Sequence, residues 1–419
     1  MSWNSVLNKF IEIKNEYKIK FGYIKYDYIN ETCLEGWVRE LINIDLVQYK
    51  EYEDILSYLE LNQYENMLLI KYGRYENVCD TEFETSYENL WDKYDGFYRE
   101  CRSIVIDIKN DCIILCPFKK FFNINEIEET SLENIKKKID NAKTIEFSDK
   151  LDGSMQIARW YNNKIIMAGS QALNPNNSWR LKNGYEMINV LPGYKEMLIK
   201  YPEYTFIFEY ISLKDAHVVK YTKEQEGLYL IGIRDVKTGN EFDYNNILSI
   251  AKQFDIPTTK LFDKTIEQVI SELDDKTSDE AEGFVINIDG YKVKLKYNDY
   301  VNIHKILSKS SSINLIIRSI ADGNFDDLIS KLPISYHDRV NEIAKIVFNY
   351  IHKTEKLIKQ YYDMAPKDDR KKFMVYISKN VPKEYQGYCR ELYYGHKINV
   401  IRSGNDKSPH YKKLSDINI

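Results

Sequence analysis

Apolar residues in the middle of the chain occur in short runs, separated by glycine, asparagine and aspartate. Runs of this length between turn-forming residues are typical of strands in antiparallel sheets. Two stretches with helical spacing, residues 181–200 and 245–254, interrupt the series. The pattern therefore predicts an α+β region with more than one sheet. The strand-like runs are residues 104–106, 113–115, 157–158, 164–167, 206–208, 228–231 and 284–286.

The first hundred residues mix the two patterns. Helical spacing is seen over residues 6–17 and 49–61, whereas residues 67–72 have the composition of a strand. Residues 1–62 form an N-terminal extension to which the pattern assigns no fold. We expect them to belong to one domain over residues 1–304, built from antiparallel sheets with flanking helices.

Beyond His304 the strand pattern stops, and apolar residues recur at helical spacing. The expected helices are residues 340–361, 370–378 and 385–394. We therefore predict a second, all-α domain over residues 305–419.

The charge of the chain limits how it can contact nucleic acid. The 419 residues carry a formal net charge of -5 and a mean hydropathy of -0.51, values typical of a soluble globular protein of two or three domains. A net negative protein has no overall attraction for RNA, so any RNA-binding surface has to be local. From Pro366 onward, Lys and Arg outnumber Asp and Glu by twelve to six. That excess fits RNA contact and a solvated helical face equally well.

Cysteine usage and hydropathy indicate a cytoplasmic protein. Six cysteines in a chain of this length make no disulfide framework. Cys112 and Cys116 have the spacing of metal ligands, but the other cysteines and the histidines complete no zinc pattern. No apolar run approaches the roughly 18 residues that a membrane span needs. We expect reduced thiols, no membrane contact, a monomer, and a location in the cytoplasm.

Lys150 opens a Lys-x-Asp-Gly segment with Asp152 and Gly153. A lysine attacks a phosphoryl or carbonyl centre only when its amine is neutral, a form favoured by burial and by nearby cations. Asp152 puts a carboxylate two residues beyond the lysine, and Gly153 permits a tight turn or a close approach of two backbones. On its own this segment is weak evidence, because it occurs by chance in many proteins.

Four further charged residues lie within strand-like runs or at their ends. Lys294 and Lys296 alternate in such a run, so both side chains leave the same face of a sheet, where they could bind a triphosphate and lower the pKa of Lys150. Glu209 closes an apolar run and suits hydrogen bonding to ribose hydroxyls. Glu282 opens another run, where its carboxylate could hold a magnesium ion directly or through water. Taken singly, each of these residues is more typical of an ordinary protein surface.

The order and spacing of these segments resemble the covalent nucleotidyltransferases, the superfamily of DNA ligases, RNA ligases and mRNA capping enzymes. Within it the chain is most similar to the bacteriophage RNA ligase 1 family. The similarity covers residues 95–305 and continues more loosely through Asp326 and Asp327. It implies a nucleotidyltransferase domain of the ATP-grasp-like ligase type. The matching segments are residues 100–102, 120–123, 150–154, 208–209, 231–235, 238–239 and 282–304.

The resemblance implies a nucleophile and a set of phosphate-binding cations. Lys150 would carry AMP, and Asp152 would support both the nucleophile and a metal ion. The cations that would contact the phosphates of ATP are Arg102, Lys120, Lys294 and Lys296.

The resemblance also implies contacts to the nucleoside and to metal ions. Phe122 would help form the adenosine pocket, and Glu209 would meet the ribose. Glu282 would position a magnesium ion, and Asp326 matches an acidic residue that holds a second metal in the family. The expected cofactors are therefore ATP and Mg²⁺, or Mn²⁺.

Two positions depart from the family pattern. Ser103 stands where the family has glycine after the motif arginine. Gln171 lies in a region where the family carries a lysine, and the missing cation either weakens the phosphate contacts or is replaced by Lys164.

The function that the resemblance implies is ATP-dependent joining of an RNA 3′-hydroxyl to an RNA 5′-phosphate, through a lysine–AMP intermediate and an RNA-adenylate. The expected substrate is tRNA with a broken anticodon loop, recognised by the helical domain. A DNA ligase or an mRNA capping enzyme is an alternative, although those usually follow the last lysine motif with a β-rich OB domain. A catalytically inactive RNA-binding relative is another. A P-loop NTPase or kinase is not expected, because the glycine-rich phosphate loop is missing.

If Lys150 is the nucleophile, Lys150→Ala abolishes formation of the enzyme–AMP adduct, and Lys150→Arg also fails although it keeps the charge. Mass spectrometry of the Lys150 peptide after incubation with ATP and Mg²⁺ measures the adduct. An adduct on the arginine variant would contradict the assignment.

Overall fold

A computed structural model describes residues 2–73, 87–214, 219, 221–274, 281–297, 313–331, 337–396, 398–401 and 409–415. The chain forms two compact units, one of residues 1–73 and 87–301, the other of residues 74–86 and 302–419. The domain boundary expected at residues 304 and 305 lies outside the described residues. Among the helices that the structure describes, none has the length and apolar character to cross a membrane.

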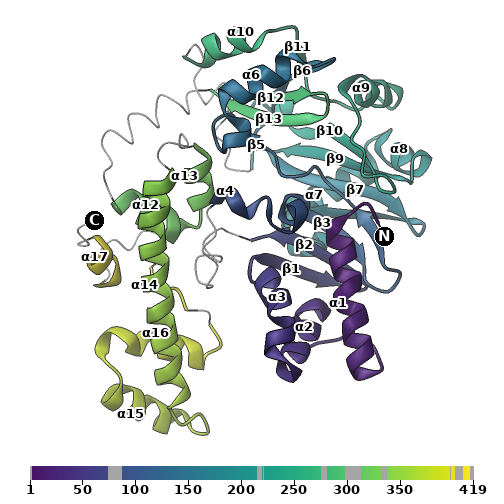
Figure 1. Cartoon of the computed structure of the whole chain (residues 1–419). Coiled ribbons are helices and arrows are strands. Elements are labelled where there is room, and N and C mark those ends of the chain that lie inside the picture. Colours follow the sequence, from purple (N-terminus) through teal and green to yellow (C-terminus); the bar gives the residue numbers. More distant parts are fainter. Residues whose placement is uncertain are drawn as a thin grey trace. The chain divides into compact units, whose positions relative to one another are not determined.

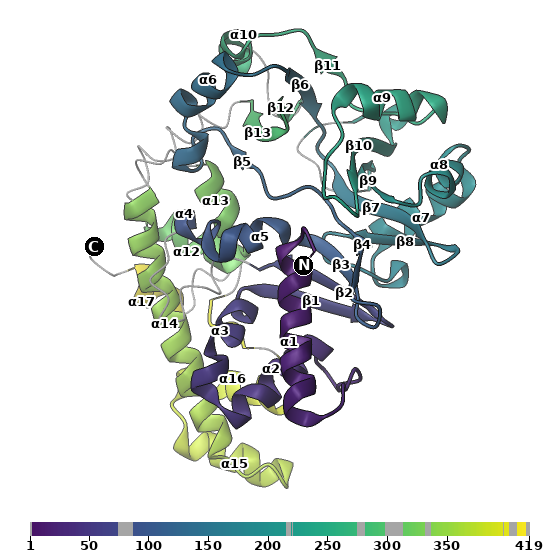
Figure 2. The same cartoon turned by 45° about the vertical axis from the view of Figure 1, so that its right-hand side comes forward.

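The first unit begins with three helices that pack beside one another (Figure 2). They are α1 (Ser5–Phe21), α2 (Cys33–Ile44) and α3 (Leu46–Ser57). Their first turns are capped by the side chains of Asn4, Thr32 and Asp45, which bind backbone N–H groups that have no partner within a helix. The helix predicted over residues 6–17 is confirmed. The helix predicted over residues 49–61 is wrong at its end, because α3 stops at Ser57 and a strand begins at Leu59.

The first sheet is antiparallel and has the strand order β1-β2-β3-β4. Its strands are β1 (Leu59–Tyr64), β2 (Met67–Tyr72), β3 (Arg102–Asp107) and β4 (Cys112–Leu115). Before β3 the chain forms α4 (Tyr87–Leu90), a 3₁₀ turn η2 (Lys93–Gly96) and α5 (Phe97–Glu100). The strands predicted over residues 67–72, 104–106 and 113–115 are confirmed.

The second sheet packs between the first sheet and a layer of helices (Figure 1). Its antiparallel order is β10-β9-β7-β8. The strands are β7 (Ser154–Tyr161), β8 (Lys164–Gly169), β9 (Tyr204–Ile211) and β10 (Gly227–Asp235). Ile157 and Ile207 face the first sheet, whereas Phe206 and Phe208 face the helices. The alternation along β9 buries both of its faces, which explains its continuous apolar run.

The helical layer is α7 (Trp179–Val190), α8 (Tyr194–Lys200) and α9 (Tyr244–Gln253). The helical stretch predicted over residues 181–200 is therefore two helices. The break falls at Pro192 and Gly193, where glycine adopts φ 87°, a left-handed conformation that other residues rarely take. The helix predicted over residues 245–254 is confirmed.

The third sheet has the order β11-β6-β12-β13-β5, and one of its faces is covered by α6 and α10 (Figure 1). The antiparallel pairing that we expected holds for β11, β6, β12 and β13, whereas β5 runs parallel to β13. Its strands are β5 (Phe122–Asn123), β6 (Ile145–Lys150), β11 (Leu261–Phe262), β12 (Gly283–Ile288) and β13 (Tyr291–Lys296). The covering helices are α6 (Leu132–Asp140) and α10 (Ile266–Ser271). The remaining 3₁₀ turns of the first unit are η3 (Glu128–Thr130), η4 (Pro175–Asn177), η5 (Lys223–Gln225) and η6 (Glu272–Asp274).

The described part of the second unit is helical, as the spacing of apolar residues predicted. Its helices are α12 (Ile313–Asp322), α13 (Phe325–Lys331), α14 (His337–Asp363), α15 (Arg370–Asn380), α16 (Lys383–Tyr393) and α17 (Pro409–Ser415). The long helix α14 packs against α12 and α16. Val340, Ile343 and Val347 lie on its buried side, at the intervals that the sequence pattern indicated.

A buried ion pair ties distant segments of the first unit together. The guanidinium of Arg234 in β10 donates two hydrogen bonds to the Glu100 carboxylate, at 2.9 and 3.1 Å. It also donates to the carbonyl oxygens of Pro117 and Gly239. The exposed fractions of the two charged side chains are 1% and 7%. Most N–H donors of the Arg234 guanidinium therefore bind acceptors inside the protein.

Removing one partner of such a pair costs about 3–5 kcal/mol because the other stays buried, and the exposed ammonium of Lys119, 3.0 Å from Glu100, compensates that carboxylate only in part. We expect Arg234→Ala to lower the free energy of unfolding by about that amount, measured by urea denaturation. The exposed pair of Arg39 and Glu31 provides a control, and Arg39→Ala should cost less than about 1 kcal/mol. Equal losses in the two variants would contradict this account.

Candidate functional site

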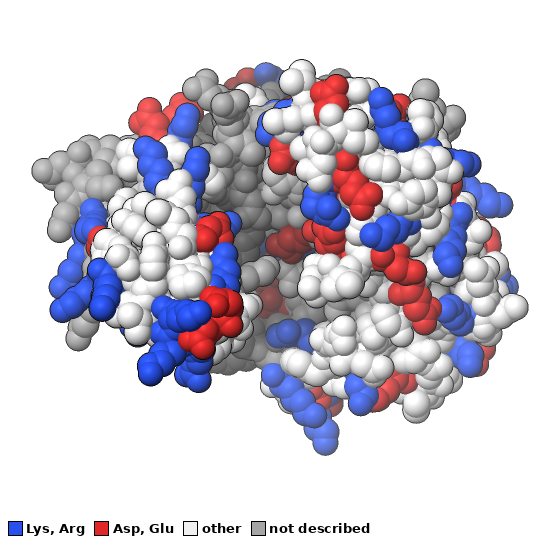
Figure 3. All heavy atoms as spheres, turned by 90° about the horizontal axis from the view of Figure 1, so that it is seen from below, with Lys and Arg blue, Asp and Glu red and all other residues white. Residues whose placement is uncertain are grey.

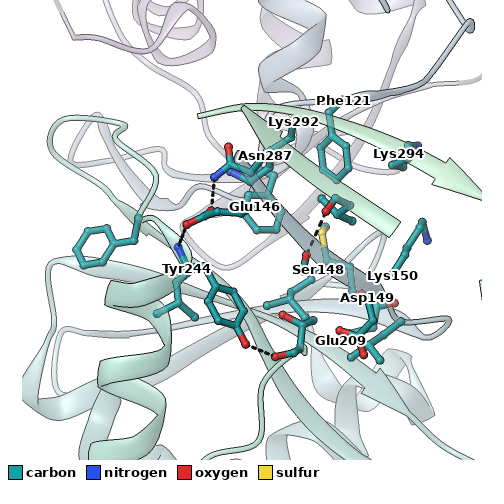
Figure 4. A pocket seen from close by; sticks show the side chains of 18 of the residues that line it. Phe121, Glu146, Ser148, Asp149, Lys150, Glu209, Tyr244, Asn287, Lys292 and Lys294 are labelled. Carbon is teal, nitrogen blue, oxygen red and sulfur yellow. Dashed lines mark hydrogen bonds between the residues drawn. The ribbon is translucent and has the colours of Figure 1, made fainter. Parts of the chain in front are cut away.

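A cavity of about 190 Å³ lies against the uncovered face of the third sheet (Figure 4). Side chains alternate between the two faces of a strand, so every second residue of β6, β12 and β13 faces the cavity. The strand register aligns these residues in three rows: Lys150 with Gly283 and Lys296, Ser148 with Val285 and Lys294, and Glu146 with Asn287 and Lys292. Charged groups therefore occupy both ends of the cavity, and the middle row combines the uncharged Ser148 and Val285 with Lys294.

Lys150 is the last residue of β6, and its ammonium lies beside the carboxylate of Glu282. Its Nζ donates to Glu282 Oε2 at 2.5 Å, and the Nζ of Lys296 lies 3.2 Å from Glu282 Oε1. The exposed fractions of the Lys150, Glu282 and Lys296 side chains are 21%, 16% and 26%. One carboxylate thus links the two lysines at the same end of the cavity.

Asp152 fixes the loop that follows Lys150. Its backbone N–H donates to the hydroxyl of Tyr221 at 2.7 Å, and its carboxylate accepts from the backbone N–H of Val219 at 3.0 Å. A Cβ added at Gly153 would lie 2.6 Å from the carbonyl oxygen of Tyr210 in β9. Glycine is needed at this position because β7 starts in close contact with β9. Nothing in the sequence pattern indicated the part played by Tyr221.

Two groups at the cavity have pKa values shifted toward neutrality. Burial raises the pKa of the Glu209 carboxyl to about 7, and the Lys150 ammonium opposes that shift. Burial lowers the pKa of the Lys294 ammonium to about 7, a shift opposed by Glu126 and reinforced by nearby cations. Glu209 lies within β9 and not at its end as the apolar run suggested. Both groups can therefore change charge near neutral pH.

Arg102 reaches this cavity, whereas Lys120 and Phe122 do not line it. The guanidinium of Arg102 lies over the ring of Phe121 at 4.9 Å, and both residues line the cavity. Phe122 is 2% exposed and packs against Trp91. Lys120 lies over Trp91 at 4.4 Å and lines a neighbouring cavity of about 600 Å³, which also contains Phe122. Phe121, one position before the residue predicted, therefore lines the first cavity, together with Phe118, Phe242 and Tyr244.

Ser103 keeps the backbone shape that glycine would give. It is an extra residue in β3, at a register shift opposite β2, and has φ 75°. A β-bulge with this left-handed conformation favours glycine. The buried Ser103 hydroxyl donates to the carbonyl oxygen of Ser170 at 2.8 Å. The first departure from the family pattern is therefore accommodated locally.

The second departure is not filled by Lys164. That residue opens β8, at the end of the strand opposite Gly169, and its Nζ lies 3.6 Å from a carboxylate oxygen of Glu65. Gln171 instead donates to the Glu60 carboxylate at 2.9 Å. The structure therefore gives no support to Lys164 as the replacement cation.

Of the two predicted metal-binding residues, Glu282 lies beside Lys150 and Lys296, which line the cavity. A single carboxylate fits Mg²⁺, which keeps several water ligands and takes others from phosphate oxygens. Asp326 lies in the first turn of α13 in the second unit, so its metal role stays a prediction. Among the described residues, no group of three or more His, Cys, Asp or Glu side chains is placed to hold a metal ion.

Comparison with known families and proteins gives consistent matches. A family model described as RNA ligase matches residues 100–300. A protein from Autographa californica nuclear polyhedrosis virus, described as a bifunctional polynucleotide kinase/RNA ligase, is 23% identical over 297 residues, which are 63% of this chain and 41% of that protein. A protein from Thermovibrio ammonificans described as an RNA ligase is 24% identical over 308 residues, 69% of this chain and 76% of the relative. The chain thus spans less than half of the viral protein.

Solved structures of a Naegleria gruberi RNA ligase are more distant. A variant with ATP and Mn matches with a TM-score of 0.35 and 19% identity, covering 45% of this chain and 58% of that one. The same ligase with PPi matches with a TM-score of 0.33 and 18% identity, covering 44% and 57%.

The shifted pKa values predict how stability depends on pH. The pKa of Glu209 rises from 4.5 to about 7 on folding, so its contribution is present below pH 4.5 and is lost as pH rises through about 7. The pKa of Lys294 falls from 10.5 to about 7, so its contribution is present above pH 10.5 and is lost as pH falls through about 7. Taken together, the two groups therefore lower the free energy of unfolding most near neutral pH.

Urea denaturation at a series of pH values measures this dependence. Glu209→Gln should remove the fall in the free energy of unfolding on the acid side of neutrality, and Lys294→Met should remove the rise on the alkaline side. Each variant serves as the control for the other. If either variant kept the wild-type dependence of the free energy of unfolding on pH in its range, the corresponding assignment would be refuted.

Proposed function

We propose that the chain, whose residues 100–300 match a family model described as RNA ligase, is an ATP-dependent RNA ligase. It joins an RNA 3′-hydroxyl to an RNA 5′-phosphate through a lysine–AMP intermediate and an RNA-adenylate. The single observation that carries the proposal is the arrangement at the cavity of the third sheet, where Lys150 and Lys296 share the Glu282 carboxylate.

In the first step, the Lys150 amine attacks the α-phosphate of ATP, a lysine–phosphate bond forms, and pyrophosphate leaves. Arg102, Lys294 and Lys296 line the cavity and offer positive charge to the phosphates. A Mg²⁺ ion held by Glu282 would neutralise phosphate charge. In the free protein the Glu282 carboxylate is paired with the Lys150 ammonium. If the carboxylate bound another group instead, its attraction for this ammonium would be weaker.

The nucleoside is placed by the rest of the cavity. Glu209 accepts hydrogen bonds from ribose hydroxyls, and the ring of Phe121 takes the adenosine contact first predicted for Phe122, because Phe121 lines the cavity. AMP then passes from Lys150 to the RNA 5′-phosphate. In the last step the RNA 3′-hydroxyl attacks that phosphate and AMP leaves. Holding both ends together removes much of the entropic barrier to joining them.

The helical unit is proposed to recognise the RNA, with a tRNA broken in its anticodon loop as the substrate. Figure 3 shows basic side chains gathered on the face that this unit presents, with acidic ones among them. The exposed basic residues of α15 and α16 are Arg370, Lys371, Lys372, Lys379, Lys383 and Arg390. Contact with RNA phosphates needs such a local surface, because the whole chain has a charge of -5.

Three alternatives remain as outcomes of one experiment. A DNA ligase would join DNA, a capping enzyme would form an adduct with GTP, and an inactive relative would form no adduct. After the last lysine motif, the elements described in this chain are helices, whereas DNA ligases and capping enzymes usually continue into a β-rich domain. That difference favours the RNA ligase.

The protein is incubated with Mg²⁺ and labelled ATP or GTP, then with 5′-phosphorylated RNA or DNA strands. We expect an adduct with ATP alone, and joining of RNA. Glu282→Ala should reduce joining by about a hundredfold or more, because it removes charge stabilisation in the site. Glu133→Ala, which changes an exposed residue on α6, is the control and should join RNA normally. Normal joining by the Glu282 variant would exclude its metal role.

A further inference from the structure

The carboxylate of Glu126 is buried at the edge of the third sheet. The residue is 1% exposed and lies three residues after Asn123, which ends β5. Its Oε2 accepts hydrogen bonds from the backbone N–H and from the side-chain amide of Asn123, both at 2.7 Å. Burying a carboxylate is costly unless hydrogen bonds and opposite charge compensate. The nearby charges therefore decide what this group does.

Two of the predicted phosphate-binding lysines lie beside this carboxylate. The Nζ of Lys120 is 3.9 Å from Glu126 Oε1, and its side chain is 11% exposed. Lys294 is paired with Asn123 in the register of β13 and β5, and its carbonyl oxygen accepts from the backbone N–H of Ile124 at 2.9 Å. The turn that holds Glu126 is thus attached directly to the strand that carries Lys294.

Apart from Glu126, the charges that act most strongly on Lys294 are of its own sign, although the carboxylates of Glu146, Asp149 and Glu209 also line the cavity. Lys120, Arg102 and Lys150 each act against its positive charge, as does burial, and Glu126 is the group that favours it most. The ring of Phe121, 5.5 Å from its Nζ, adds a weaker favourable contact. These groups come from β3, β6 and the segment around β5, which together surround the lysine. A phosphate-binding lysine in this setting needs a counter-charge to remain an ammonium near neutral pH.

We propose that Glu126 is a positioning residue for phosphate binding, whose buried carboxylate holds Lys120 and supplies the counter-charge for Lys294. The phosphate role of the two lysines rests on the proposed function, whereas the effect of Glu126 on Lys294 does not. Glu126 acts through the lysines and does not touch the nucleotide. The alternative is a purely structural role, in which Glu126 only closes the turn at Asn123.

Glu126→Gln separates the two roles, because the amide oxygen still accepts from Asn123 while the charge is lost. In the free protein, competitive acylation of lysines over about pH 5.5 to about pH 11, read by mass spectrometry, gives the titration midpoint of Lys294. We expect this midpoint to fall by about one pH unit in Glu126→Gln. It should stay at the wild-type value in Glu133→Gln, the exposed control on α6.

A second measurement ties the charge to the nucleotide. The ATP concentration that half-saturates adduct formation should rise as Lys294 loses its charge, and in Glu126→Gln this rise should occur about one pH unit lower than in the wild type. Lys294→Arg in the same background should remove this extra pH dependence, because arginine stays charged. A purely structural role would produce neither the shifted dependence nor its removal.

A folded Glu126→Gln variant with an unchanged Lys294 midpoint would overturn the proposal. If that variant does not fold, Glu126→Asp can replace it, because aspartate keeps the charge one methylene further back. We then expect a smaller fall in the Lys294 midpoint. No fall would overturn the proposal. Acylation needs no nucleotide. A wild-type protein without an adduct would therefore refute the ligase function, while the acylation result would still decide the role of Glu126.

Discussion

The site depends on one carboxylate shared between two ammonium groups. Glu282 binds Lys150 and Lys296 across neighbouring strands, and without it the two lysines would repel each other at the same end of a half-buried cavity. The register of the third sheet makes the arrangement possible, since Lys150, Gly283 and Lys296 lie in one row. A slip of one residue in either strand pair would turn these side chains to the opposite face.

The covered face of the same sheet fixes this register. Phe147, Phe284, Ile286 and Val293 alternate with the residues of the cavity and pack beneath α6 and α10. Burial of this apolar face specifies the strand pairing, and the pairing in turn sets the positions of the charged side chains. The charged residues are therefore placed by hydrophobic contacts on the other side of the sheet, where a substitution would change the site without touching it.

Much of the fold and of the site followed from sequence because the evidence was local. Alternating lysines in β13 indicated their common face, and the apolar runs located most strands. The same reasoning missed the break between α7 and α8, since apolar spacing continues across Pro192 and Gly193. It also placed Phe122 at the nucleoside. Phe121 lines the cavity, whereas Phe122 is buried against Trp91, a contact that the sequence pattern does not reveal.

Other parts of the site depend on contacts that join distant segments, for which a single sequence carries no signal. Tyr221 reaches Asp152 from a loop 69 residues further along the chain. In the sequence, nothing distinguishes Glu126 from other acidic residues in turns. Its position near Lys294 results from the pairing of β5 with β13. The shifts in the pKa of Glu209 and Lys294 likewise arise from burial, which the spacing of residues does not reveal.

The bulge at Ser103 shows that a substituted motif residue does not by itself mean an altered site. A serine held at positive φ carries a conformational cost of about 1–2 kcal/mol relative to glycine, and its bond to Ser170 offsets part of that cost. Arg102, the neighbouring residue, still reaches the cavity. A comparison of residue types at this position would show that the motif glycine is lost. The backbone conformation that the glycine provides is nevertheless retained.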